Sequence, residues 1–243
     1  MPCFYAPDMN KNDNIVILSG PELHHIIHVF RKKEGDEITL SSGNGLVAIG
    51  IIESIKKKEL TVSIIQIITM QKSHPQIAIA FPLLKNKHDN MIIEKLTELG
   101  VTDFFPIIAE RAVRNSSKNT VEKFKKVAIT AMKQCDNAFL PHIHKVQSIP
   151  ELLGNMEEHT PLAALEIGKH ETLNEIVEKT EKKSICIIIG PEGGFDKKEI
   201  EHLQNKNVTT FTLGNHILRA ETAAIASVSQ LVGYFLQNNP EYY

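Results

Sequence analysis

The sequence predicts an α/β protein in which a small β-barrel is followed by a larger part built on a parallel sheet. Two observations carry this prediction. In the first third of the chain, short apolar runs are separated by glycine-bearing or charged turns, a pattern typical of a small barrel. After a polar stretch at residues 70–75, apolar runs alternate with segments of helical periodicity, which indicates parallel strands with helices on both faces of the sheet. We therefore expect two domains, residues 1–72 and residues 73–243.

Four strands and one helix are expected in the N-terminal part. The strands are predicted at residues 15–18, 37–40, 46–55 and 60–68. A helix is predicted after Ser19, because Ser19 and Glu22 have the spacing of a capping box, in which each side chain bonds the backbone of the other residue. Its apolar face consists of Leu23, Ile26, Ile27 and Phe30.

Strands and helices alternate in the rest of the chain. Strands are predicted at residues 76–82, 102–109, 162–165, 185–189 and 208–213. Helices are predicted at residues 89–99, 121–135, 173–177 and 221–236. Two capping boxes predict two further helices, and they are formed by Ser148 with Glu151 and by Asp196 with Glu199. Two cysteines are expected in the core, Cys135 on a helix face and Cys186 in a strand.

The composition excludes several classes of protein. With 42% hydrophobic residues in a chain of 243, the protein is neither disordered nor collagen-like. No apolar run approaches the roughly 20 residues that cross a bilayer, and the N-terminus has no secretory signal. The three cysteines lack disulfide or zinc spacing, and the helical histidine pairs at residues 24–28 have no further ligand nearby. We therefore expect a cytoplasmic protein that binds neither metal nor membrane.

The net charge of −2 is unevenly distributed. Residues 73–145 carry 11 basic and 7 acidic side chains, a net +4, whereas residues 146–243 carry 8 and 14, a net −6. A polyanion would therefore bind near the middle of the chain. The lysines there fit a solvated helix face and an RNA contact equally well, and they are Lys118, Lys123, Lys125 and Lys126.

Two loops at the carboxyl ends of predicted strands are candidates for binding a ligand. The first, at residues 190–195, has three glycines and a proline in its first five positions, which leaves backbone amides accessible to a ligand. It lacks the spacing of the glycine-rich motifs that bind dinucleotides or nucleoside triphosphates. A tight turn from strand to helix is an equally good interpretation of this composition.

The second loop, at residues 213–224, combines apolar Leu218 with Arg219, Glu221 and Thr222, a mixture suited to an apolar ligand with a polar end. The alternative is that Glu221 complements the start of the following helix and Arg219 pairs with it. Both loops follow consecutive strands, so both are expected to open on the same edge of the sheet.

These two loops also give a resemblance to a known family. Residues 190–195 read GPEGGF and residues 213–224 read LGxxILRxETAA, in an order and spacing that are highly specific. Shorter segments match as well, at residues 25–31, 85–90, 94–101, 110–111 and 134–141. The chain resembles the RsmE family of SPOUT-class RNA methyltransferases over nearly its whole length.

The resemblance implies a PUA-like, RNA-binding β-barrel at residues 1–72 and a SPOUT α/β domain at residues 73–243, with a trefoil knot within about 160–237. It implies a homodimer through the second domain, the cofactor S-adenosylmethionine, and methylation of N3 of a uridine in 16S ribosomal RNA of the small subunit. The cofactor-binding residues implied are Leu165, Gly190, Pro191, Glu192, Gly193, Gly194, Leu213, Gly214, Leu218 and Thr222.

The catalytic residues implied are Arg219, which would stabilise the anion formed at N3 or the target phosphate, and Glu221, as an orienting group. The RNA-binding residues implied are His25, Arg31, Lys85, Lys87 and Arg111. The chain departs from the family where His28 and Asn90 occupy positions that usually hold arginine, and Asn137 lies near a third such position. Two other functions stay open: methylation of another RNA such as tRNA, and a non-catalytic ribosome-binding factor.

Overall fold

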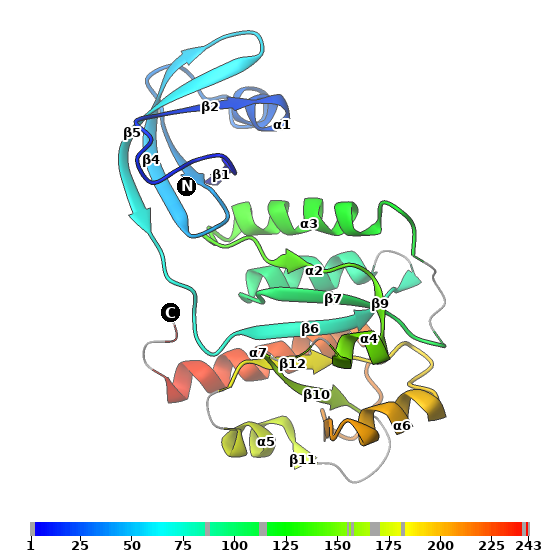
Figure 1. Ribbon diagram of the computed structural model, residues 1–243. Coiled ribbons are helices and arrows are strands. Elements are labelled where there is room, and N and C mark those ends of the chain that lie inside the picture. The colour runs from blue at the N-terminus through cyan, green and yellow to red at the C-terminus, as the bar shows by residue number, and fades with distance from the viewer. Residues whose placement is uncertain are drawn as a thin grey trace. The chain divides into compact units, whose positions relative to one another are not determined.

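The chain divides into two compact units in a computed structural model that describes residues 3–85, 88–111, 116–154, 156, 158–165, 171–180, 183–239 and 242 (Figure 1). Unit 1 comprises Met1–Lys72 and Ile129–Leu140, and unit 2 comprises Ser73–Ala128 and Pro141–Tyr243. Helix α3 (Thr120–Gln134) begins in unit 2 and ends in unit 1. Unit 1 is therefore built from two separate stretches of sequence.

Unit 1 contains a curled five-stranded sheet in the order β1-β3-β4-β5-β2 (Figure 1). Its strands are β1 (Cys3–Tyr5), β2 (Ile15–Ser19), β3 (Glu37–Ser41), β4 (Leu46–Ile55) and β5 (Glu59–Thr69). All neighbours are antiparallel except β1 and β3, which are parallel. The four predicted strands are confirmed. Strand β1 was not predicted, because three residues are too few to show an alternating pattern.

The helix of unit 1 differs from its prediction. It consists of α1 (Gly20–His24), which continues into a π-helix at His25–Val29. The predicted capping box is wrong, because the Ser19 side chain makes no capping hydrogen bond. The Glu22 carboxylate instead accepts a hydrogen bond from the Tyr5 backbone N–H at 3.3 Å and pairs with Lys133 Nζ at 2.7 Å. Phe30, at the end of the predicted apolar face, follows the π-helix and is 39% exposed.

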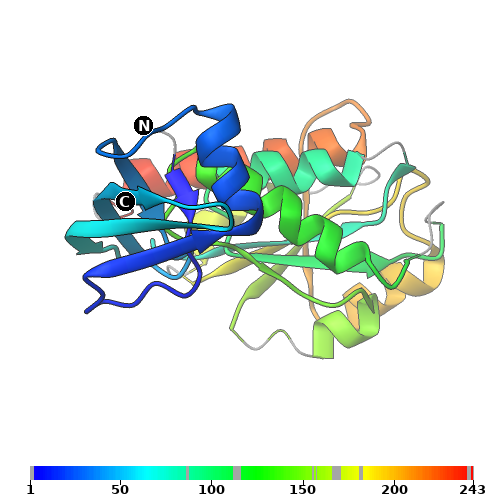
Figure 2. The same cartoon turned by 90° about the horizontal axis from the view of Figure 1, so that it is seen from above.

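Unit 2 is built on a parallel sheet, as predicted, in the order β11-β13-β10-β12-β6-β7-β8, with β9 also paired to β7. Its strands are β6 (Ile77–Pro82), β7 (Asp103–Ile108), β8 (His142–Ile143), β9 (Gln147–Ser148), β10 (Thr160–Ala164), β11 (Glu171–Thr172), β12 (Ile185–Ile188) and β13 (Thr209–Thr212). Its helices, besides the first part of α3, are α2 (His88–Glu98), α4 (Ile149–Gly154), α5 (Leu173–Lys179), α6 (Lys197–Asn205) and α7 (Ala220–Asn238). Helices α2 and α7 lie on one side of the strands, and α4 and α6 lie on the other (Figure 2).

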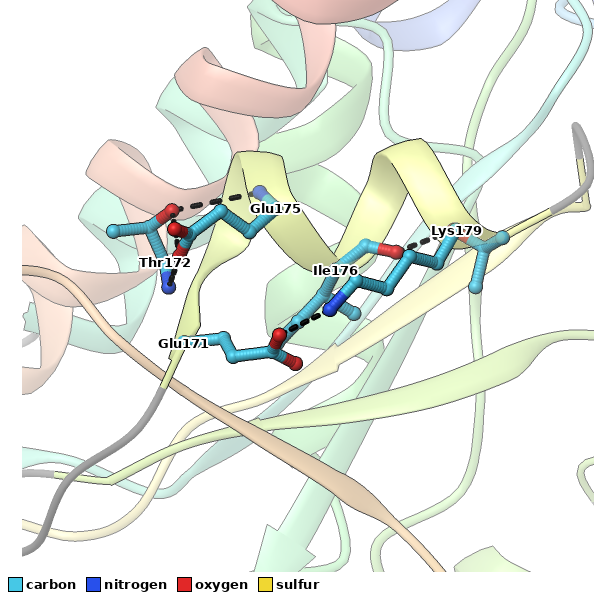
Figure 3. Close-up of polar contacts among 6 residues, drawn as sticks. Glu171, Thr172, Glu175, Ile176 and Lys179 are labelled. Atoms are coloured by element: carbon cyan, nitrogen blue, oxygen red, sulfur yellow. Dashed lines mark hydrogen bonds and ion pairs between the residues drawn. The ribbon is translucent and has the colours of Figure 1, made fainter.

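Capping boxes begin three of these helices. The pairs Ser148 with Glu151 and Asp196 with Glu199 form as predicted. A third box, not predicted, begins α5, where Thr172 Oγ1 accepts from the Glu175 N–H and the Glu175 carboxylate accepts from the Thr172 N–H (Figure 3). An ion pair between Lys179 and Glu171 joins the end of α5 to β11 (Figure 3). Local side-chain bonds thus fix where these helices start.

The core of unit 2 lies on both faces of the sheet. On one face, Ala80 and Ile188 pack with Leu152 of α4 and Leu203 of α6. On the other, the Phe81 ring lies 5.8 Å from the Phe124 ring of α3. Cys186 is fully buried as predicted, and burial raises the pKa of its thiol. The prediction for Cys135 is wrong, because Cys135 follows the last residue of α3 and is exposed.

No helix in the described part of the chain is long and apolar enough to span a membrane. The knot predicted within about 160–237 stays a prediction, since that range includes residues 166–170 and 181–182, which lie outside the described residues.

Candidate active site

A cavity of about 190 Å³ lies in unit 2 at the edge of the sheet where three parallel strands end. Leu165 follows β10, Ile189 follows β12 and Leu213 follows β13, and all three line the cavity. The complete lining is Arg111, Ala164, Leu165, Ile189, Gly190, Pro191, Gly193, Gly194, Phe195, Ile200, Thr212, Leu213, Gly214, His216, Leu218, Ala220 and Ala223. Carboxyl ends of parallel strands are where ligands bind in sheets of this kind.

The glycine-rich loop after β12 requires its small residues. A Cβ atom on Gly190 would lie 3.0 Å from the Phe195 ring, which is itself buried. Gly194 has a φ of +69°, a left-handed conformation that favours glycine, and its N–H donates to the Pro191 carbonyl at 2.8 Å. The loop is therefore a closed turn whose backbone forms part of the cavity wall.

The loop after β13 forms another part of the lining. Gly214 has a φ of +131°, and its N–H donates to Thr212 Oγ1 at 3.3 Å. Leu213 and Leu218 are half-buried, while Ile217 between them is 76% exposed. The chain then enters α7, whose Ala220 and Ala223 complete this part of the lining. Small side chains at the start of α7 thus leave room for a ligand.

Eight of the ten predicted cofactor-binding residues line this cavity, and Glu192 and Thr222 do not. Neither do the two predicted catalytic residues, Arg219 and Glu221, which flank the lining residue Ala220. Sequence reasoning missed several lining residues, namely Ala164, Ile189, Phe195, Ile200, Thr212, His216, Ala220 and Ala223. For His216, its position inside the second loop was an available signal.

Glu221 is held by a residue from a distant part of the chain. Its side chain is 9% exposed, and His88 Nδ1 at the start of α2 lies 2.7 Å from its Oε1. Burial alone would raise the pKa of Glu221, but hydrogen bonds from its own backbone N–H and from His88, together with the charge of Arg219, lower it. The partner proposed from the sequence, Arg219, is exposed and is the N-cap residue of α7, where its side chain makes no capping bond.

Arg111 lies against the glycine-rich loop. It belongs to the segment that follows β7, and its Nη1 donates to the Gly193 carbonyl at 2.9 Å. The preceding N–H, that of Glu110, donates to Glu199 Oε1 at 2.9 Å. Two bonds therefore join the end of β7 to the segment that follows β12.

The other predicted RNA-binding residues are divided between the units. His25 and Arg31 belong to unit 1, where His25 Nδ1 lies 3.3 Å from Lys133 Nζ and Arg31 is exposed. Lys85 is exposed in unit 2, and Lys87 lies outside the described residues.

The chain combines a curled five-stranded sheet with a parallel sheet whose strand ends form a glycine-lined cavity, and comparison with known proteins identifies the class as RNA methyltransferases. Residues 71–232 match the RNA methyltransferase domain family, and residues 18–65 match the PUA domain of RNA methyltransferases. The matched domain covers more than half of the chain.

Individual relatives show which family of RNA methyltransferases the chain resembles. The chain is 31% identical over 225 residues to "Ribosomal RNA small subunit methyltransferase E" of Bacillus subtilis, covering 88% of each chain. The solved structure of the protein of that name from Neisseria gonorrhoeae, bound to S-adenosylmethionine, has 26% identity and a TM-score of 0.87, covering 96% of this chain and 98% of the other. A methyltransferase of Legionella pneumophila in complex with the same cofactor has 27% identity and a TM-score of 0.86, covering 96% and 97%. The protein described here belongs to the RsmE family, which confirms the resemblance seen in its sequence.

Proposed function

We propose that this protein transfers a methyl group from S-adenosylmethionine to N3 of a uridine in 16S ribosomal RNA. The single observation that carries the proposal is the cavity formed by the two loops that follow β12 and β13. Similar proteins support it: the relatives from Bacillus subtilis and Neisseria gonorrhoeae are named as methyltransferases of small-subunit ribosomal RNA, and the structures from Neisseria gonorrhoeae and Legionella pneumophila hold the cofactor.

The cavity fits a nucleoside attached to an amino acid. Leu165, Leu213 and Leu218 offer apolar surface for an adenine ring. Backbone groups of the glycine-rich loop are accessible to polar parts of the ligand, since Gly190 and Gly194 have no side chains to cover them. The sulfonium group of the cofactor, when bound, supplies an electrophilic methyl carbon.

Transfer of that methyl group is a direct displacement, so the protein's main task is to align the uridine N3 with the methyl carbon. The N3 proton must leave, and the negative charge that develops on the base requires stabilisation. We assign this stabilisation to Arg219, whose exposed side chain follows the cavity residue Leu218. Glu221, fixed by His88, would orient the start of α7 that carries Arg219.

On the RNA side, we propose that unit 1 binds the substrate through His25 and Arg31, and that Lys85 and Lys87 also contact phosphates. Arg111, which was also predicted to bind RNA, lines the cavity. The target uridine would leave its stack to reach the cavity. A homodimer through the second domain, a trefoil knot in that domain and a cytoplasmic location are parts of the same proposal.

The test is mass analysis of nucleosides from small-subunit ribosomal RNA of a strain that lacks the gene, before and after complementation. We expect N3-methyluridine to disappear on deletion and to return with the wild-type gene. Unchanged N3-methyluridine would reject the proposed target, and loss of a modified nucleoside from tRNA would assign the enzyme to that RNA. Calorimetry with S-adenosylmethionine addresses the remaining alternative, because a non-catalytic ribosome-binding factor would show no binding.

A further inference from the structure

Arg111 occupies a position on the cavity wall that its sequence context did not indicate. The parallel strands β12, β6 and β7 are neighbours in that order, so the segments after β12 and β7 both lie at the same edge, with β6 between them. Arg111 lines the cavity, and its guanidinium reaches the Gly193 carbonyl, 82 positions away in the sequence. A Cβ atom on Gly193 would lie 3.4 Å from the Arg111 Cβ, so the backbone of the loop and the arginine side chain are in close contact.

The charge of the lining is unbalanced. Among the described residues that line the cavity, Arg111 is the one permanent cation, and none is a carboxylate. His216 is the other ionisable lining residue, and the rest of the lining is apolar, glycine or threonine. A ligand with one anionic group would therefore place that group near Arg111, with its apolar surface against the rest of the lining.

S-adenosylmethionine carries one anionic group, the carboxylate of its amino-acid end, together with a cationic ammonium and a cationic sulfonium. We propose that Arg111 binds this carboxylate and thereby selects the full cofactor over nucleosides that lack an anionic group, an inference that rests on the proposed function. A guanidinium has five N–H groups, so the bond to Gly193 leaves donors for a ligand. The same bond holds the guanidinium beside the loop before the ligand arrives, which lowers the entropy lost on binding.

Two other roles for Arg111 make different predictions. If Arg111 only braces the glycine-rich loop, its loss would weaken all adenosine ligands equally. If the carboxylate instead binds at the N-terminus of α7, where Ala220 and Ala223 also line the cavity, discrimination would not depend on Arg111.

The test compares the affinities of two ligands for the wild-type protein and for variants at Arg111, measured by calorimetry without RNA. The two ligands are S-adenosylhomocysteine and its decarboxylated analogue, which keeps the amine and lacks only the carboxylate. We expect the wild-type protein to bind S-adenosylhomocysteine about tenfold more tightly than the decarboxylated analogue, since a charge-assisted hydrogen bond contributes about this factor. In Arg111→Gln the two ligands should bind within about twofold of each other, and Arg111→Lys should restore part of the difference.

Lys198→Gln is the matched control, because it removes one positive charge from an exposed position on the neighbouring helix α6 that does not line the cavity. It should discriminate between the ligands as the wild type does. The inference would be overturned if Arg111→Gln kept the wild-type ratio of the two affinities, or if it weakened the binding of both ligands equally. Neither result would contradict the proposed methylation. A wild-type protein that binds neither ligand would overturn the proposed function and this inference together.

Discussion

Gly190 shows how one missing side chain shapes the candidate site. A Cβ atom there would meet the Phe195 ring at 3.0 Å, and Phe195 is only 7% exposed and has little room to move. The larger side chain in Gly190→Val should therefore push the loop into the cavity. We expect the affinity for S-adenosylmethionine to fall at least about tenfold, a factor within the usual cost of overpacking.

Calorimetry measures this effect, with Gly154→Ala as the control. Gly154 is the last residue of α4, and a Cβ atom on it would have no neighbour within 4 Å. The control should bind the cofactor like the wild type. Unchanged affinity in Gly190→Val would show that the loop after β12 does not hold the ligand.

A substitution at Arg219 should slow methylation without changing the affinity for the cofactor. Its side chain is exposed and lies outside the cavity lining, so Arg219→Ala should leave the affinity for S-adenosylmethionine within about twofold of wild type. Methylation should slow by roughly 10²–10³-fold, the usual effect of removing one group that stabilises developing charge. Single-turnover transfer of labelled methyl groups to the RNA measures it, and wild-type rates in this variant would remove Arg219 from the mechanism.

At the scale of elements, the pair His88–Glu221 joins the start of α2 to the start of α7. Because the pKa of Glu221 is lowered in the folded state, the carboxylate contributes stability above the ordinary glutamate pKa of about 4.3. That contribution is lost as the pH falls through the lowered pKa. Glu221→Gln should therefore melt roughly 2–4 °C below the wild type at pH 7.

The melting difference should shrink as the pH is lowered from about 5 toward 3, where the wild-type carboxylate becomes protonated. Thermal unfolding across this pH range is the measurement. Glu201→Gln, at an exposed position on α6, is the control and should follow the wild type at every pH. A melting difference that stays constant with pH would show that Glu221 stabilises the fold without its charge.

Elements with a local cause were predictable from the sequence. Strand β4 was predicted with the bounds that it has, Leu46–Ile55, and the boxes at Ser148 and Asp196 begin their helices because both partners are three residues apart. The prediction at Ser19 failed because Glu22 is bound to Lys133, 111 positions away. The positions of His88 and Arg111 at the site were likewise unpredictable, since each depends on a contact between segments that only the sheet brings together.

At the scale of the whole molecule, the last part of α3 and residues up to 140 complete unit 1. Met132 is fully buried, and a Cβ atom on Gly43 would lie 3.6 Å from its Sδ. The ion pair of Lys133 with Glu22 is only 12% and 18% exposed at its two side chains. Residues 129–140 are therefore an integral part of unit 1.

Breaking this ion pair should destabilise unit 1. In Glu22→Gln the Lys133 ammonium loses its charged partner in a mostly buried position, and we expect a loss of about 2 kcal/mol in the free energy of unfolding. Lys133→Met in addition should recover much of that loss, because the uncompensated charge is removed. Urea unfolding of both variants measures the effect, and a double variant no more stable than Glu22→Gln would contradict it.

The shared helix α3 also has a consequence for how the protein is made. Synthesis proceeds from the N-terminus, and domains generally fold as units when their residues have left the ribosome. The first 72 residues of this chain lack the segment 129–140, so unit 1 is not complete when its own sheet has been translated. Its completion waits until residue 140 has emerged, when β6, α2 and β7 of unit 2 are already outside the ribosome. Unit 1 can therefore be completed only after the first strands of unit 2 have been translated.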